Sequence, residues 1–358
     1  MSSRYLHHRP PPRGGGALHR PSWGTNQDVN PIEAALRAVD RFQQRHPWLG
    51  FPLAVVKKSS DDESGSMAAL LAYYGFVAIF PSLLILVTVF GLLLRDNPAL
   101  QERVLRSALI DFPVIGDQLQ QNVRSLSGSP VALVAGVLGA LLGARGVAAT
   151  AQNALNRVWG VPKAHRPGFP FNLLRSLGLL ALIGTGALAA AVLAGISGGS
   201  GAWAGWVRLG VLAATFVVNA GLFVGAFRLA TAKEVRTRDL APGAIAAAIV
   251  WQVLLALGGY VVNHYLRHAS EVYGTFGVVL GLLSWLYLQA QLTLYLAEAD
   301  VVRAQRLWPR GLVQPPLTAG DVEAYRRYVA TEVRRPEQQV DVRFTSPEPD
   351  RPGADPEP

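Results

Sequence analysis

The sequence predicts an all-α, polytopic membrane protein, a bundle of six transmembrane helices with cytoplasmic N- and C-termini. Three observations predict this fold class. Half of the 358 residues are apolar, and only 16% are charged. The apolar residues occur in long runs, whereas the charged residues collect near the two ends and in short connections, which is typical of membrane proteins. The basic residues are concentrated in alternate connections, which predicts an orientation in the bilayer.

The first span is predicted at residues 68–94, AALLAYYGFVAIFPSLLILVTVFGLLL, which contain no charged residue. A helix rises about 1.5 Å per residue, so this run can cross a hydrocarbon core of roughly 30 Å. Pro81 cannot donate a hydrogen bond to the carbonyl of Val77, so we expect the helix to kink there. In lipid the freed carbonyl needs another protein partner, which predicts that this helix packs inside a bundle. A structural kink and a hinge for transport would both use such a proline.

Five further apolar runs are long enough to span a bilayer. With the first, the predicted spans are residues 68–94, 131–150, 173–196, 207–229, 241–262 and 272–297. The flanking segments are predicted as a disordered basic arm (1–29), an amphipathic, interfacial helical segment (30–58), an outer helical cap (95–130) and a mostly disordered cytoplasmic tail (301–358). Segment 30–58 could equally be a docking helix of a cytoplasmic layer. A short helix is expected within 318–335.

Several spans carry small or polar residues. Glycines at 136, 139, 143 and 146 share one face of the second span, which favours close helix packing. The candidate intramembrane pathway residues are Arg145, Asn219, Gln252 and Gln289. Arg145 either extends to the interface or faces a wet cavity. The amides either hydrogen-bond neighbouring helices or line a pathway for a solute.

The basic residues predict the topology through the positive-inside rule. They lie before the first span (Arg37, Arg41, Arg45, Lys57, Lys58), after the second (Arg157, Lys163, Arg166), after the fourth (Lys233, Arg236, Arg238) and after the sixth (Arg303, Arg306, Arg310). These four segments are expected in the cytoplasm. The net charge of +9 predicts anionic lipid headgroups as partners, and no nucleic acid is expected because the basic segments lack interleaved aromatic residues.

The residue types argue against enzyme chemistry. The chain has no cysteine, which excludes disulfides, thiolate catalysis and iron–sulfur clusters. His264 and His268 are four residues apart, where an interfacial pair without metal is expected. Glu298 and Asp300 are two apart, so on a helix they point to different sides, and we expect interfacial solvation of both. We therefore predict no catalytic residues, no metal and no cofactor.

An ordered set of short motifs resembles the YihY/BrkB family of bacterial inner-membrane proteins. The motifs are AALLAYY (68–74) with FP (80–81), ALNRVW (154–159), APGA (241–244) leading to Trp251, YGTFG (273–277), SWLY (284–287) and AE (297–298). The resemblance covers residues 32 to 308. The motif positions are Tyr73, Tyr74, Asn156, Trp159, Tyr273, Gly274, Trp285 and Glu298. Ala297 stands where the family often has glycine, which we interpret as a packing change.

The resemblance implies a multi-pass protein of the bacterial plasma membrane. Members were long labelled ribonuclease BN, a label now regarded as misassigned, and roles in exporting lipids or small solutes have been suggested. The leading hypothesis is a transporter or exporter of lipid or a small amphiphilic solute. The alternative is a non-catalytic membrane scaffold or envelope-integrity protein, and a tRNA-processing ribonuclease is the least supported. The substrate, the energy source and the oligomeric state do not follow from the sequence.

Overall fold

The structure, a computed structural model, describes residues 31–93, 130–168, 170–196, 204–261, 267–314, 316–335 and 337–344. Regular structure in these ranges is helical throughout. The helices are α1 (Pro31–Arg45), α2 (Pro47–Asp61), α3 (Ser64–Leu93), α6 (Pro130–Val158), α7 (Phe171–Ile196), α8 (Ala204–Ala230), α9 (Thr237–Val261), α10 (Arg267–Gln305) and α11 (Ala319–Thr331), with a 3₁₀ turn at Lys163–His165. The all-α prediction is confirmed for these residues. The predicted outer cap and the N-terminal arm lie outside them.

The six predicted spans each fall largely within one long helix, from α3 to α10. In the described residues, three stretches are long and apolar enough to cross a membrane: Leu209–Ala230, Thr237–Gly258 and Val279–Gln305. Ser64–Ile79 and Phe171–Gly186 form shorter apolar helical stretches. A membrane protein is therefore supported, while the count of six spans stays a prediction. Pro81 lies within α3, and the kink expected there also stays a prediction.

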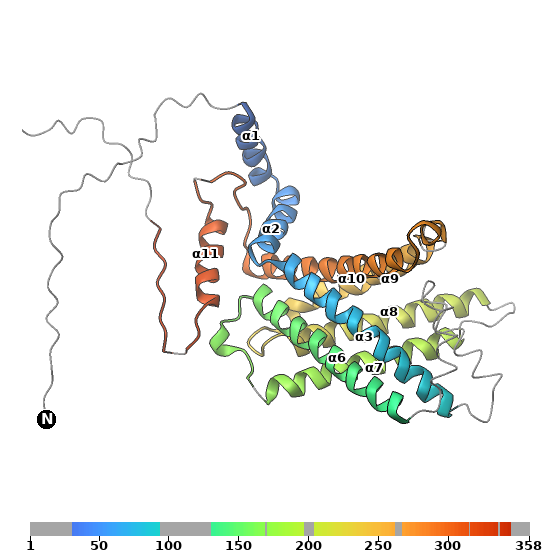
Figure 1. The fold of residues 1–358 in the computed structure, drawn as a ribbon. Coiled ribbons are helices and arrows are strands. Elements are labelled where there is room, and N and C mark those ends of the chain that lie inside the picture. The colour runs from blue at the N-terminus through green and yellow to red at the C-terminus, as the bar shows by residue number, and fades with distance from the viewer. Residues whose placement is uncertain are drawn as a thin grey trace, which may run out of the picture.

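The long helices form a closed ring in chain order. Each contacts the next, from α3 through α6, α7, α8 and α9 to α10, and α10 returns to contact α3. Figure 1 shows α3 crossing alongside α6. Large apolar side chains remain exposed along these helices, among them Leu142 (69%), Val217 (66%) and Phe276 (68%). Such an extensive apolar surface is unusual for a soluble monomer and fits contact with lipid.

Glycines permit the closest approaches between helices. A Cβ atom added to Gly143 of α6 would lie 2.9 Å from the Cα of Ala78 in α3. A Cβ on Gly146 would overlap the ring of Tyr74, and one on Gly258 of α9 would lie 2.8 Å from the indole of Trp285. Because glycine has no Cβ atom, a neighbouring backbone or aromatic ring can approach the helix at these positions more closely than any other residue would allow. Gly143 and Gly146 therefore serve the packing predicted for their face.

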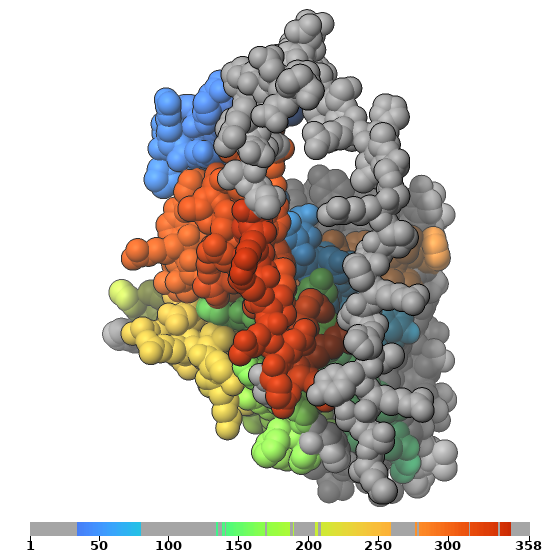
Figure 2. All heavy atoms as spheres, turned by 90° about the vertical axis from the view of Figure 1, so that its left-hand side faces the viewer, coloured from blue at the N-terminus to red at the C-terminus, as the bar shows by residue number. Residues whose placement is uncertain are grey.

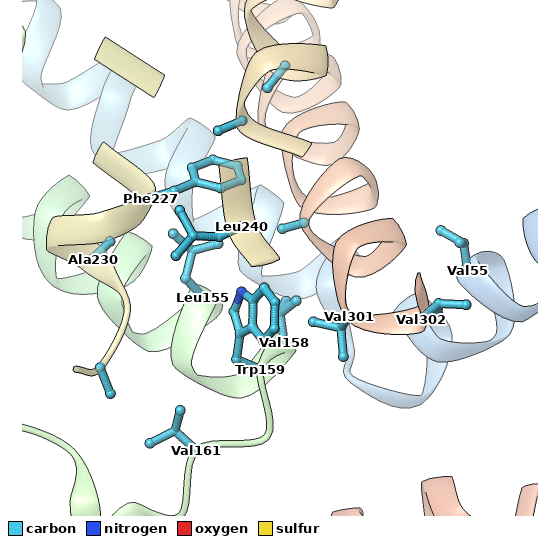
Figure 3. Packing of buried hydrophobic residues seen from close by; sticks show 14 of the residues in the cluster. Val55, Leu155, Val158, Trp159, Val161, Phe227, Ala230, Leu240, Val301 and Val302 are labelled. Carbon is cyan, nitrogen blue, oxygen red and sulfur yellow. The ribbon is translucent and has the colours of Figure 1, made fainter. Parts of the chain in front are cut away.

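The main cluster of buried apolar side chains among the described residues lies at one end of the ring. There the C-terminal turns of α6, α8 and α10 meet the start of α9. Figure 3 shows Trp159 and Val158 of this region beside Leu240 and Val301. Leu240 is 0% and Val158 2% exposed. A water-excluding core at this end contrasts with the lipid-type surface along the helices.

Helices α1, α2 and α11 gather at the same end (Figure 1). Figure 2 looks onto it, with the orange and red C-terminal segment lying over the ends of other helices. The predicted tail at 301–358 thus begins with an ordered, packed segment, because Leu307, Arg310 and Asp321 are all buried. The short helix expected within 318–335 is confirmed as α11, with Thr318 and Asp321 forming its capping box.

Candidate functional site at the basic end of the bundle

A buried ion cluster centred on Lys58 of α2 joins four helices, α2, α3, α6 and α10. The Lys58 ammonium donates to the Glu298 carboxylate of α10 at 2.7 Å, to the carbonyl of Val158 in α6 at 2.7 Å, and to Asp62. All three N–H groups of this ammonium are therefore satisfied. The Ser64 hydroxyl donates to the other Glu298 oxygen at 2.7 Å. Glu298 is completely buried, so its two carboxyl oxygens have protein groups alone as partners.

The environment of Lys58 keeps it protonated. Burial by itself would lower the pKa of this ammonium, but the charges of Glu298 and Asp62 outweigh burial and raise the pKa above its usual value. Keeping two carboxylates and one ammonium away from water is costly, and their mutual contacts, with the Ser64 hydroxyl on Glu298, offset that cost. The cluster therefore depends on all of its members being present together.

A second buried cluster fixes the C-terminal segment. The Arg310 guanidinium donates to Asp321 at 3.0 Å and to Asp61 of α2 at 2.7 Å, and Lys57 donates to Asp321 at 3.1 Å. Burial would raise the pKa of Asp321, but hydrogen bonds from Gly311, Thr318 and Arg310 lower it to about 2. Asp321 is thus ionised at neutral pH, and the buried Arg310–Asp321 pair ties α11 to the partly exposed Lys57 and Asp61 of α2.

The connection between α8 and α9 and the first turns of α9 are each held by a side chain from another helix. Asn156 of α6 accepts a hydrogen bond from the backbone N–H of Ala232 at 2.9 Å. Asp300 of α10 accepts one from the N–H of Gly243 at 2.9 Å, next to Pro242 in the first turns of α9. A Cβ at Gly243 would overlap Asp300, so glycine is required for this approach. The motif residues Asn156 and Gly243 therefore have packing roles.

Next to the Lys58 cluster lies a pocket of about 260 Å³. One wall is polar and basic, formed by Asn153 and Arg157 of α6 with Lys163 and Arg166 of the following connection. A second, apolar wall is formed by Met67 and Leu70 of α3. Thr150, Thr331 and Glu332 complete the lining. The pocket therefore offers both cationic and apolar contacts at one end of a membrane-type bundle.

The three cations that line the pocket differ in whether a carboxylate forms an ion pair with them. Lys163 lies 2.6 Å from Glu332, and Arg157 lies 3.3 Å from Glu63, with both carboxylates more than half exposed. Arg166 donates through Nε to the carbonyl of Val161 at 3.2 Å, and among the described residues no carboxylate forms an ion pair with it. Burial and the nearby charge of Arg157 lower the pKa of Arg166, and the charge of Glu332 only partly offsets them. The guanidinium thus sits in an electropositive, partly desolvated position.

The structure does not bring the four candidate pathway residues together at this pocket. Arg145 is exposed on α6, Asn219 of α8 and Gln252 of α9 are half-buried, and Gln289 of α10 is buried. None of the four lines the 260 Å³ pocket. Of the motif aromatics, Tyr73 is exposed, while Tyr74 and Trp285 pack on glycines. Tyr273 and Gly274 lie within α10, and their side chains are outside the described part.

Two expectations about charged residues differ from the structure. Glu298 and Asp300 are 0% and 3% exposed, so both are buried and hydrogen-bonded rather than solvated at an interface. They do point to different sides of α10, as their spacing predicted. Lys58, at the end of the segment 30–58 that was expected at the membrane interface, is likewise buried. The only feature of the sequence that pointed to a paired Lys58 was its four-residue spacing to Asp62, which suits an ion pair on a helix. Arg310 and Asp321 gave no comparable sign of burial.

Together, the ring of apolar helices and the charge-rich packing at one end define a helical membrane protein. Comparison with known protein families shows which one this is. The chain belongs to the Virulence factor BrkB family, whose model matches residues 55–316. That range includes Lys58, Glu298 and Arg310 and ends before α11. The comparisons found no matching curated protein and no matching solved structure.

Proposed function

We propose that the protein is a transporter or exporter for a lipid or a small amphiphilic solute in the bacterial plasma membrane, and that it carries out no chemical step. The observation that carries the proposal is the pocket of about 260 Å³ between α3 and α6, which is lined by both basic and apolar side chains. An amphiphile presents the same two chemistries, a polar head and an apolar tail. The pocket lies where these two helices enter their apolar stretches, so a solute could pass from it along the bundle surface.

The proposal is tested with the full-length protein reconstituted into liposomes. The measurement is the rate at which a phospholipid carrying a fluorescent headgroup becomes accessible to a membrane-impermeant quencher, together with the efflux of a trapped short-chain amphiphile. Proteoliposomes should move at least one of the two several-fold faster than protein-free liposomes.

A pair of tryptophan substitutions on α6 makes the test specific. Asn153→Trp places an indole in the pocket from an exposed position and should return the rate to background. Leu142→Trp makes the same change on the outer face of α6, where Leu142 is 69% exposed, and should leave the rate unchanged. If the folded, unsubstituted protein moves neither solute, the proposal is wrong, and a non-transporting scaffold is favoured.

A further inference from the structure

The charges around the pocket point to an anionic ligand. Its basic wall combines Arg157, Lys163 and Arg166, whereas Glu332 is the one carboxylate among its lining residues. The carboxylates paired with Arg157 and Lys163 are 63% and 61% exposed, so water weakens both ion pairs. Arg166 has no carboxylate partner among the described residues and is only partly hydrated. Such a cation is stabilised by an anion that enters the pocket.

The donor types favour a phosphate group over a single carboxylate. A guanidinium presents several N–H donors in a planar fork that matches the oxygens of phosphate, and two arginines with one lysine can surround such a group from several directions. The Asn153 amide adds a neutral donor on the same wall. The volume of about 260 Å³ accommodates a phosphate with a few attached atoms and is too small for a whole lipid.

The apolar wall shows how the rest of the ligand would lie. Leu70 lines the pocket and is 46% exposed, and Tyr73 and Val77, three and seven residues further along α3, are 57% and 39% exposed. This spacing places the three side chains along one side of the helix. They form an apolar stripe that begins at the pocket and continues along α3. A free phosphate would use the basic wall only, whereas a phospholipid would use both.

We propose that this pocket binds the phosphate headgroup of an anionic membrane lipid, with Arg157, Lys163 and Arg166 holding the phosphate and the Leu70–Tyr73–Val77 stripe supporting the acyl chains. The inference deepens the proposed function by naming the chemical class of the amphiphile, and it rests on that function only for the claim that the lipid moves. Binding and movement are measured separately. A lipid that binds without moving would leave this site intact and would remove the transport function.

The test measures binding of a fluorescent short-chain phosphatidic acid to the full-length protein in neutral detergent. Arg166→Gln should weaken binding about tenfold or more, since a charge-assisted hydrogen bond contributes enough for such a change. The matched control is Arg238→Gln, which removes the same charge at the same end from a 74% exposed side chain outside the pocket. Lys163→Glu provides a second variant, because Lys163 is exposed and its reversal leaves the core intact.

Competition separates the possible ligands. Short-chain phosphatidylglycerol should displace the probe, while inorganic phosphate and neutral diacylglycerol should require far higher concentrations. Equal loss of binding in Arg166→Gln and Arg238→Gln would show that the probe responds only to general surface charge, and it would overturn the proposed binding site. Displacement by inorganic phosphate as effective as by the lipid would overturn the role of the α3 stripe. Displacement by diacylglycerol as effective as by phosphatidylglycerol would overturn the role of the cations.

Discussion

At the scale of single residues, the end of α10 is defined by two carboxylates with separate tasks. Glu298 faces Lys58 and Ser64, and Asp300 faces the backbone of Gly243 at the start of α9. Two positions along a helix differ by about 200° in direction, so these neighbours reach opposite partners. One short segment of α10 thereby anchors α2, α3 and α9. The motif residue Glu298 is thus explained by assembly of the bundle end.

Replacing Lys58 by methionine should destabilise the protein by about 3–5 kcal/mol, because Glu298 and Asp62 would remain buried without their ammonium partner. Lys163→Met is the matched control: its pair with Glu332 is largely exposed, so the loss should be at most about 1 kcal/mol. Both variants are compared by unfolding of the purified protein in detergent. Equal losses would show that the Lys58 cluster adds no more than a surface ion pair.

At the scale of elements, the close contact between α3 and α6 depends on glycines in α6, which have no side chain to keep the helices apart. At Gly143 the neighbouring atoms belong to the backbone and Cβ of Ala78, which cannot rotate away. At Gly146 the neighbour is the ring of Tyr74, which also blocks any added group. Because α3 and α6 carry the two walls of the pocket, their spacing also sets its width. Helix packing and the proposed binding site are therefore linked.

Gly143→Ala should lower stability by about 1–3 kcal/mol, since the added methyl group forces α6 away from α3. The matched control is Gly184→Ala in α7, where no atom outside the helix lies within 4 Å of the added Cβ. That change should be neutral or slightly stabilising, because alanine favours the helix more than glycine does. Thermal unfolding in detergent measures both. A Gly143→Ala protein as stable as its control would contradict the observed approach of the two helices.

At the scale of the whole molecule, the basic connections lie at a common end. Lys58 reaches the carbonyl of Val158, Asn156 holds the α8–α9 connection, and Lys163 pairs with Glu332 beyond α11. These links join segments separated by 76 to 169 residues. The positive-inside rule predicts that this end faces the cytoplasm. Clustering of the basic segments at one end is what such a topology requires.

The orientation can be measured directly because the chain has no cysteine. Arg236→Cys places a thiol at the basic end, and Trp206→Cys places one near the opposite end of α8, both at exposed positions. In right-side-out spheroplasts, a membrane-impermeant maleimide should label the cysteine at 206 and not the one at 236. Opening the membrane should make position 236 reactive. Labelling of position 236 in intact spheroplasts would reverse the predicted topology.

Local patterns were enough to predict the helices but not their charged contacts. Long apolar runs and caps such as Thr318 with Asp321 depend on neighbouring residues, so the positions of the long helices and of α11 followed from the sequence. Arg145 and Asn219 were singled out because polarity within an apolar run is visible locally. Lys58 and Arg157 were noted only as topology signals, since their partners and the pocket arise from distant parts of the chain.

The sequence by itself determined that this is an all-helical membrane protein of the BrkB type, because apolar run length and the order of motifs are properties of the linear chain. Only the tertiary structure decided that Lys58, Glu298 and Arg310 are buried, and that Arg157, Lys163 and Arg166 line one pocket with Met67 and Leu70. The physical reason is that burial of a charge depends on partners from helices far apart in sequence. Those partners meet only when the ring closes.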